Sequence, residues 1–134
     1  MPNYRARSTF RAGSFARLEQ LLVPKLVAGA TAAAAAVLEI SQGLVPVDTG
    51  ELKSSGGTSV EWTRQRVTGY VIYSSPHAGY VEFGTGLRGA ASAGAGPYPY
   101  SETWPGMVAK PYIRPALDIG RQQILDAFTA ALGV

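Results

Sequence analysis

Apolar side chains in the first third of the chain recur every three or four residues, which is the period of an α-helix. The series consists of Leu26, Ala30, Ala33, Val37, Ile40 and Leu44. Because proline suits the first position of a helix, the pattern predicts a long helix from Pro24 to about Gln42. Ser14 is expected to cap a shorter helix over residues 15–23, which Pro24 would end. Six of the seven residues from 30 to 36 are alanine, so the long helix should be slim enough for another backbone to approach closely.

In the middle of the chain the helical period ends, and β-branched and aromatic residues become frequent. Residues 56–63 and 66–74 are predicted to form two antiparallel strands, joined by a polar turn from Thr63 to Arg66. Near the end, apolar residues again follow a helical period, which predicts a C-terminal helix from Pro115 to Leu132. The fold class is therefore α+β, with a long N-terminal helix and a C-terminal helix packed on a small antiparallel β-sheet.

A long stretch between the strands and the last helix follows neither period. Residues 87–107 contain four glycines, four alanines and three prolines, which predicts a flexible loop. This extended loop, taken as residues 84–109, lies within a single α+β domain of residues 14–134. Residues 1–13 carry three arginines and no acidic residue, and are expected to form a flexible basic arm.

With 134 residues the chain has the length of one domain, and its 16% of charged residues is below the roughly 25% of an average soluble protein. A partner is therefore expected to cover part of the surface. The chain has no cysteine and one histidine, which excludes thiol chemistry, disulfides and metal sites built on two imidazoles of one subunit. We expect a non-enzyme without catalytic residues, metal, cofactor or small-molecule substrate. The longest charge-free apolar run, residues 26–38, spans 13 residues against the roughly 20 of a membrane-spanning helix, so no membrane contact is expected.

Two patterns suggest enzyme-like chemistry but are better explained by local structure. Residues 84–89 match the G-x-G-x-x-G pattern of dinucleotide-binding turns, yet no helix is expected after them. His77 lies near Ser74, Ser75 and Glu82 in the sequence, the residue types of a hydrolase triad. A histidine in a Ser-Pro-His turn is more typical of a surface turn, and we favour that interpretation.

Asp48 and Glu51 are spaced three residues apart, as a metal-binding or acid/base pair of carboxylates could be. Asp48 also follows a proline and precedes Thr49 and Gly50, a sequence typical of a tight turn. We therefore expect Asp48 to cap this turn.

Two groups of residues are candidates for contacts with partners. The basic arm alternates arginines with aromatic residues, its arginines being Arg5, Arg7 and Arg11. Such an arm neutralises phosphates and stacks on bases, but we favour a tail that orders against a neighbouring subunit. The loop contributes three aromatic residues, Tyr98, Tyr100 and Trp104. They are either interface anchors or residues that pack back on the domain, and the sequence leaves both interpretations open.

Three segments carry a resemblance to a known family. Residues 44–55 read LVPVDTGELKSS and contain Asp48, Thr49 and Gly50. Residues 80–85 read YVEFGT, that is Tyr80, Val81, Glu82, Phe83, Gly84 and Thr85, and residues 109–117 read AKPYIRPAL, with Pro111, Arg114 and Pro115. Together, and in this order, they resemble the VPVDTGxLxxS, YVEFGT and AxPFLRPAL signatures of the gp-ten-like head-to-tail joining proteins of long-tailed bacteriophages. We call residues 44–55, 80–85 and 109–117 the first, second and third motifs.

The resemblance implies a structural virion component of the phage neck or tail-completion region, made in the host bacterial cytoplasm and without enzymatic activity. It implies a cyclic homo-oligomer, with a hexamer favoured, that forms a ring around the DNA channel, contacts other phage neck and tail proteins and touches the channel DNA non-specifically. The chain departs from the family at Tyr112, where phenylalanine is commoner, and in its longer, glycine-richer loop. The alternative function is a small nucleic-acid-binding adaptor that uses the basic arm.

The second and third motifs also predict a contact with each other. Glu82 and Arg114 are the two charges inside otherwise apolar parts of these motifs, and we expect them to form an ion pair. Val81, Phe83 and Leu117 are expected to share one core beside this pair.

Overall fold

The computed structural model describes residues 12–133 and contains an α-helix of 33 residues, α1 (Ala12–Leu44). Pro24 lies inside this helix, so the predicted break at residue 24 is wrong, and Ser14 lies within the helix rather than at its cap. An internal proline leaves one carbonyl of the preceding turn without its helical partner. Gln20, four residues earlier, is exposed, so water can satisfy that carbonyl. The predicted basic arm lies outside the described residues up to residue 11, and its last two residues belong to α1.

The two predicted strands are confirmed to within one residue at each end. Strands β1 (Gly56–Trp62) and β2 (Val67–Tyr73) pair antiparallel, and the amide of Thr63 closes their turn on the carbonyl of Arg66 at 2.8 Å. The sheet packs on the alanine-rich part of α1, where a Cβ on Gly69 would lie 2.9 Å from the carbonyl oxygen of Ala30. The close approach expected of a slim helix is therefore present.

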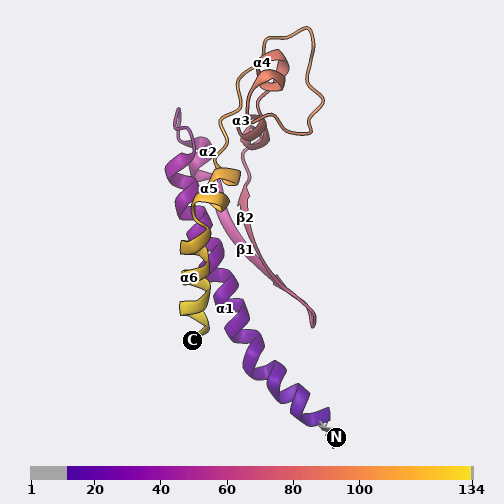
Figure 1. Cartoon of the computed structure of the whole chain (residues 1–134), viewed down its shortest axis with the longest axis vertical. Coiled ribbons are helices and arrows are strands. Elements are labelled where there is room, and N and C mark those ends of the chain that lie inside the picture. The colour runs from indigo at the N-terminus through magenta and orange to yellow at the C-terminus, as the bar shows by residue number, and fades with distance from the viewer. Residues whose placement is uncertain (1–11, 134) are drawn as a thin grey trace, which may run out of the picture.

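The predicted C-terminal helix is interrupted and consists of α5 (Ile113–Ile119) and α6 (Arg121–Leu132). The interruption falls at Gly120, which is buried against Ile40 of α1. A side chain there would also lie 2.7 Å from the carbonyl oxygen of Ala116. The break thus permits a close approach to α1, and α6 runs alongside α1 in Figure 1.

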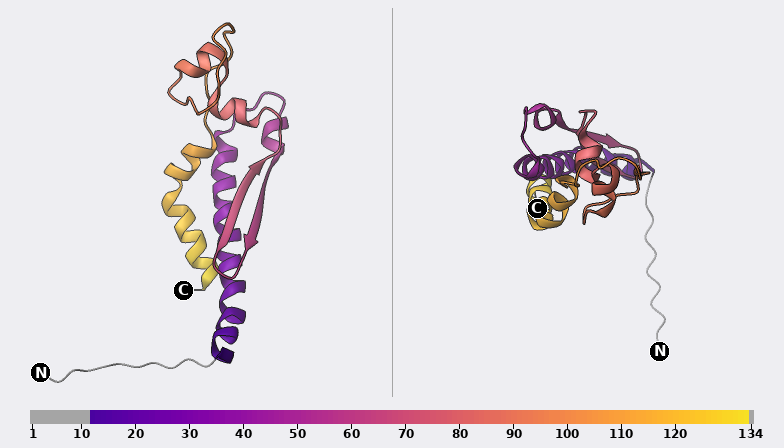
Figure 2. Two further views of the ribbon diagram at one scale, coloured as in Figure 1. Left: turned by 90° about the vertical axis from the view of Figure 1, so that its right-hand side faces the viewer. Right: turned by 90° about the horizontal axis from the view of Figure 1, so that it is seen from above.

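Short helices and the predicted loop form one end of an elongated molecule (Figures 1 and 2). They are α2 (Glu51–Ser54), α3 (Ala78–Phe83) and α4 (Gly86–Ala91). Because α4 lies inside residues 84–109, the expectation of a structureless loop there is wrong. Backbone hydrogen bonds between Thr85 and Met107, of 2.9 and 3.0 Å, fasten the two ends of the loop to each other.

The buried core consists mainly of small residues. Its apolar members are Ala30, Ala34, Ala36, Val37, Val45, Ala109, Tyr112 and Ala116. Among residues 16–133 no leucine, isoleucine or phenylalanine is buried. The expected core of Val81, Phe83 and Leu117 is therefore wrong, since Leu117 is 48% exposed and the other two are half-buried. The positions at the centre are occupied instead by Glu82, Tyr112 and Ala116.

Candidate functional site

Glu82 and Arg114 form the ion pair predicted from the motifs. Oε1 of the buried Glu82 accepts a hydrogen bond from Nε of Arg114 at 2.9 Å and another from the Arg114 amide at 3.2 Å. Its Oε2 accepts from the amides of Tyr112 at 2.7 Å and Ile113 at 3.1 Å. A single side chain of α3 therefore satisfies the amide groups at the start of α5, which would otherwise lack partners.

These hydrogen bonds keep the Glu82 carboxylate charged. Burial alone would raise the pKa of Glu82, because it removes water from the charged form. The hydrogen bonds from the Tyr112 amide, the Arg114 side chain and the amides of Ile113 and Arg114 outweigh that effect and lower the pKa below its ordinary 4.5. The pair is thus a stable charged connection between the second and third motifs.

Arg114 also connects α5 to the loop. Its Nη2 donates to the carbonyl oxygen of Glu82 at 3.0 Å and to that of Gly94 at 2.6 Å. The guanidinium lies over the ring of Phe83, 4.5 Å from the ring centroid, in the arrangement of a cation–π contact. The charge of Arg114 is used in contacts within the chain, so it is not a candidate for binding an external anion.

Tyr112 was noted from the sequence as a departure from the family pattern but was not predicted to take part in the site. It is fully buried, packs edge-on against Tyr73 with ring centroids 4.9 Å apart, and donates its hydroxyl to the carbonyl of Ala78 at 3.0 Å. Burial and the neighbouring Glu82 charge raise the pKa of Tyr112 to about 12. The tyrosine in place of the commoner phenylalanine of the third motif was the available signal, because a buried hydroxyl requires a hydrogen-bond partner.

The hydroxyl of Tyr73 continues this network into α1. It shares a hydrogen bond of 2.6 Å with Oγ of the buried Ser41 and accepts another from Nε2 of Gln42 at 3.2 Å. The same Gln42 nitrogen donates to the carbonyl of Lys53, near the end of the first motif. The network thus connects α1, β2 and Tyr112, the residue before α5, and it includes one residue of each motif, Lys53, Glu82 and Tyr112.

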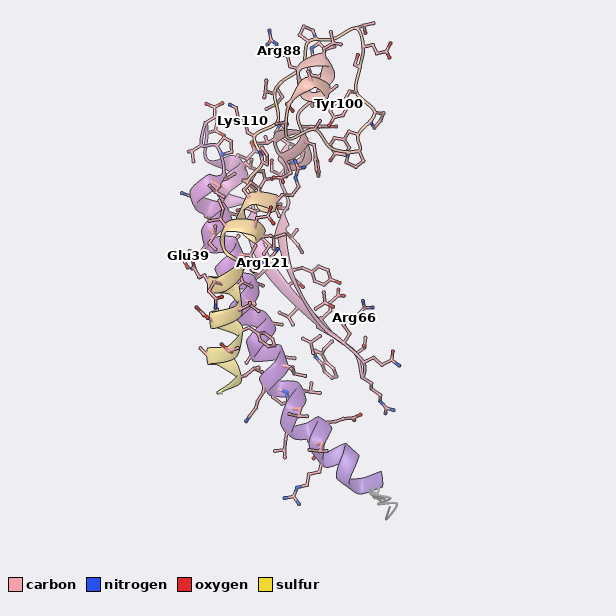
Figure 3. All side chains as sticks on the ribbon, in the orientation of Figure 1. Glu39, Arg66, Arg88, Tyr100, Lys110 and Arg121 are labelled. Atoms are coloured by element: carbon pink, nitrogen blue, oxygen red, sulfur yellow. The ribbon has the colours of Figure 1, made fainter. Side chains whose placement is uncertain are left out.

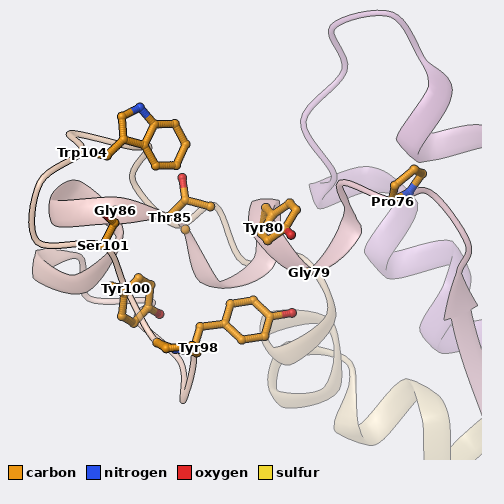
Figure 4. Close-up of a pocket in the computed structure, with 11 residues that line it drawn as sticks. Pro76, Gly79, Tyr80, Thr85, Gly86, Tyr98, Tyr100, Ser101 and Trp104 are labelled. Carbon is orange, nitrogen blue, oxygen red and sulfur yellow. The ribbon is translucent and has the colours of Figure 1, made fainter.

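An aromatic cleft of about 720 Å³ lies between α3 and the loop (Figure 4). Tyr98 packs edge-on against Phe83 and Tyr80, with centroid distances of 5.2 and 6.2 Å. The hydroxyl of Tyr100 accepts from the amide of Gly96 at 2.6 Å and donates to the carbonyl of Phe83 at 3.1 Å. Two of the three loop aromatics therefore pack back on the domain.

Trp104 behaves differently from the two tyrosines. It is 56% exposed and stands at the wall shared by this cleft and a second one of about 430 Å³. The second cleft is lined by residues of the first motif, including Asp48 and Thr49, and of the second motif, including Tyr80 and Thr85. The first two motifs therefore face one surface hollow, and Trp104 and Tyr80 are exposed aromatic residues that line it.

The turn in the first motif is organised by Thr49 rather than by Asp48. Oγ1 of Thr49 accepts a hydrogen bond from the amide of Glu51 at 3.4 Å, and Gly50 has a positive φ of 82°. Asp48 and Glu51 are both exposed. The prediction that Asp48 caps this turn is therefore wrong, because the side chain of Thr49 accepts the hydrogen bond in the turn.

The G-x-G-x-x-G segment does open a helix, α4, contrary to expectation. Its amides are nevertheless already used, since those of Leu87 and Arg88 donate to the carbonyls of Trp104 and Pro105 at 2.9 and 2.8 Å. A side chain at Gly84 or Gly86, both of which have positive φ, would collide with the backbone of residues 104–109. These glycines permit two stretches of chain to approach closely, and the amides of Leu87 and Arg88 are not available to a phosphate.

His77 occupies a turn at the start of α3. It is exposed, its amide donates to Oγ of Ser75 at 3.3 Å, and its carbonyl accepts from the amide of Val81. Oγ of Ser74 donates to the carbonyl of Ser55 at 3.4 Å. Glu82 is bonded to Arg114 and the start of α5, so these residues are not arranged as a triad.

Basic side chains are exposed at the end of the molecule opposite the loop. Arg64 and Arg66 are exposed at the hairpin turn, and Arg17 and Lys25 are exposed on the adjacent half of α1. Figure 3 shows Arg66 at this end and Arg88 at the opposite one. Arg5, Arg7 and Arg11 lie outside the described residues.

Comparisons of the chain with protein-family models, with curated proteins and with solved structures found no match. One helix in the described part of the chain, α1, is long and apolar enough to cross a membrane, with an 18-residue window of mean hydropathy 1.9. The expectation of no membrane-spanning helix rested on the 13 charge-free residues 26–38, whereas α1 continues beyond them on both sides. The C-terminal half of α1 packs on the sheet and α6, as the core helix of a globular domain does.

Proposed function

We propose that this chain is a structural component of the phage head-to-tail interface, a neck or tail-completion protein that forms a closed ring around the DNA channel, with a hexamer favoured. The observation that carries the proposal is the interlocking of the three motifs. The second motif holds the third through Glu82 and Arg114, and the first and second line the same cleft. Segments that resemble one family's signatures in the family's order thus form one connected unit.

The distribution of apolar residues supports assembly with partners. The core is built largely of alanine, while large apolar side chains such as Leu21, Trp62 and Ile119 are 60–74% exposed. A small domain gains most of its stability from burying large apolar side chains, so covering these residues in an assembly would add what the single chain lacks. Heterologous contacts repeated by a closing rotation generate a ring.

The test is the mass of the purified chain in solution, followed by electron microscopy of any assembly, and detection of the chain in purified virions. We expect rings with a central opening and a fixed number of chains per virion. A chain that stays monomeric at all concentrations and is absent from virions would contradict the proposal.

The nucleic-acid adaptor is the second candidate, and one observation favours it. Arg17, Lys25, Arg64 and Arg66 are exposed at the end of the molecule from which the arm extends in sequence. An adaptor would bind duplex DNA as a single chain, with an affinity that falls steeply with salt, whereas a ring component should assemble without DNA. Binding measured at two salt concentrations distinguishes the two functions.

A further inference from the structure

The N-terminal half of α1 carries a bare apolar surface. Its leucines are partly exposed, with exposed fractions of 45% for Leu18, 50% for Leu22 and 37% for Leu26. These three, which we call the leucine stripe, are spaced four residues apart and continue to Ala30 and then Ala34, both buried. One face of the helix is thus covered in its second half and uncovered in its first, which extends beyond the sheet and α6 (Figures 1 and 2).

A second uncovered surface lies on the outside of α5 and α6. Leu117 and Leu125 are 48% and 52% exposed, and the acidic side chains of Asp118 and Asp126 beside them are also exposed. We call these four residues the acidic outer face. Ala116 of α5 and Gly120, between the two helices, are buried.

The two surfaces extend over the same number of residues. Leu18 and Leu26 lie eight positions apart in α1, and Leu117 and Leu125 lie eight positions apart across the break at Gly120. At 1.5 Å per residue the leucine stripe is about 12 Å long. Helices that expose apolar residues can cover each other by side-chain packing.

Charge decides which surface covers the leucine stripe. Arg17 and Lys25 flank the stripe, with Glu19 as the acid among them, whereas the acidic outer face has two aspartates and the nearby Arg121. Two leucine stripes packed in parallel would bring like charges together, at a cost in free energy. Packed antiparallel about Leu22, they would pair Glu19 with Lys25 but leave Arg17 opposite Val27, without an acid. The acidic outer face offers both apolar area and opposite charge.

We propose that the leucine stripe of one copy packs on the acidic outer face of the next copy. This contact uses different surfaces on the two partners. A pair of copies therefore still has one free leucine stripe and one free acidic outer face, and the contact can be repeated until a ring closes. The inference rests on the proposed ring function and names the contact from which the ring is built.

Cross-linking tests the contact directly, because the natural chain has no cysteine. The double variant Leu22→Cys with Leu125→Cys, treated with a short bismaleimide, should give a ladder of covalent multimers. The matched control, Leu22→Cys with Arg88→Cys, places the second cysteine at the other end of the molecule and should give none. Dimers from Leu22→Cys alone, with no ladder from the double variant, would show stripe-on-stripe pairing and overturn the proposal.

Charge reversal provides an independent test. Lys25→Glu and Asp126→Lys should each weaken assembly at least tenfold in sedimentation experiments, and the two changes in one chain should restore it. Lys53→Glu, an exposed lysine of α2, is the control and should have no effect. Failure of the double variant to recover, with circular dichroism unchanged, contradicts this pairing of surfaces.

The outcomes separate this contact from the proposed function. Multimers without a cross-linked ladder would overturn the contact and leave the ring standing. A chain that remains monomeric and gives no ladder contradicts both. A third outcome is that the chain co-sediments with phosphatidylglycerol vesicles, that Leu22→Ser abolishes this binding and that no ladder forms. That result would identify a lipid bilayer as the partner of the leucine stripe and contradict the proposal that a second copy covers it.

Discussion

Glu82 and Arg114 lie 32 residues apart in the chain, and Nε of the arginine is 2.9 Å from Oε1 of the glutamate. The carboxylate also accepts hydrogen bonds from the backbone amides at the start of α5. One side chain therefore holds both the guanidinium of Arg114 and the first turn of the helix in place. Removing this carboxylate should therefore affect stability far more than removing an exposed one.

Glu82→Gln tests that expectation. The amide group of glutamine cannot accept hydrogen bonds on both of its ends, so at least one amide of Tyr112–Arg114 loses its acceptor in a buried place. We expect a loss of about 2–3 kcal/mol in the free energy of unfolding, measured by urea denaturation. Glu39→Gln, at an exposed glutamate of α1, is the control and should change it by less than about 0.5 kcal/mol. Equal effects from the two variants would contradict the role assigned to Glu82.

The lowered pKa of Glu82 predicts a dependence of stability on pH. Below the ordinary pKa of 4.5 the unfolded chain takes up a proton at this carboxyl before the folded chain does. The stabilisation is therefore complete above 4.5 and is lost as the pH falls through the lower folded pKa. Wild type should lose more unfolding free energy than Glu82→Gln between pH 7 and about pH 3. Parallel pH curves for the two proteins would show that Glu82 does not contribute.

Tyr112→Phe should remove the hydrogen bond to the Ala78 carbonyl and lower the free energy of unfolding by about 1 kcal/mol at neutral pH. The raised pKa of about 12 adds a second expectation. Above pH 10 the unfolded chain ionises this tyrosine first, so stability falls between pH 10 and 12, and it should fall less in the variant. Tyrosinate absorbance during titration measures the ionisation, and a Tyr112 that titrates near 10 in the folded protein would contradict it.

Trp104→Ala should weaken assembly while leaving the fold intact, because Trp104 is 56% exposed beside the two clefts. Tyr100→Phe is the informative comparison, since the Tyr100 hydroxyl fastens the loop to Phe83 and Gly96. That variant should lower thermal stability instead. Sedimentation and thermal denaturation of both variants distinguish the roles, and a destabilised Trp104→Ala monomer would count against an interface role.

Removal of residues 2–11 should change DNA binding little, because the intact chain is expected to bind duplex weakly. Three arginines neutralise few phosphates, and non-specific dissociation constants are typically about 10⁻⁴ to 10⁻⁶ M at physiological salt. A fluorescence titration of labelled duplex checks this. Tight binding that disappears with the arm would favour the nucleic-acid adaptor over the ring component.

The sequence by itself determined the features that depend on neighbours along the chain. The period of three and four residues placed the part of α1 after Pro24 and its end to within two residues, although it did not predict that the helix continues through Pro24. The β-branched residues placed both strands to within one residue, because these patterns reflect the local geometry of helix and strand. It also predicted the pairing of Glu82 with Arg114, since opposite charges in apolar surroundings need each other.

Only the tertiary structure decided which residues are buried and where the chain bends. Gly120 interrupts the last helix because Ile40, eighty residues earlier, packs against it, and the loop is fixed because Tyr100 reaches the carbonyl of Phe83. Leu117 fits a helical period yet is exposed, while Glu82 is charged yet buried. Burial depends on which distant segments pack against each other. The hydrophobic period of a single segment indicates which side chains share a face of the helix or strand, but not which other segment covers that face.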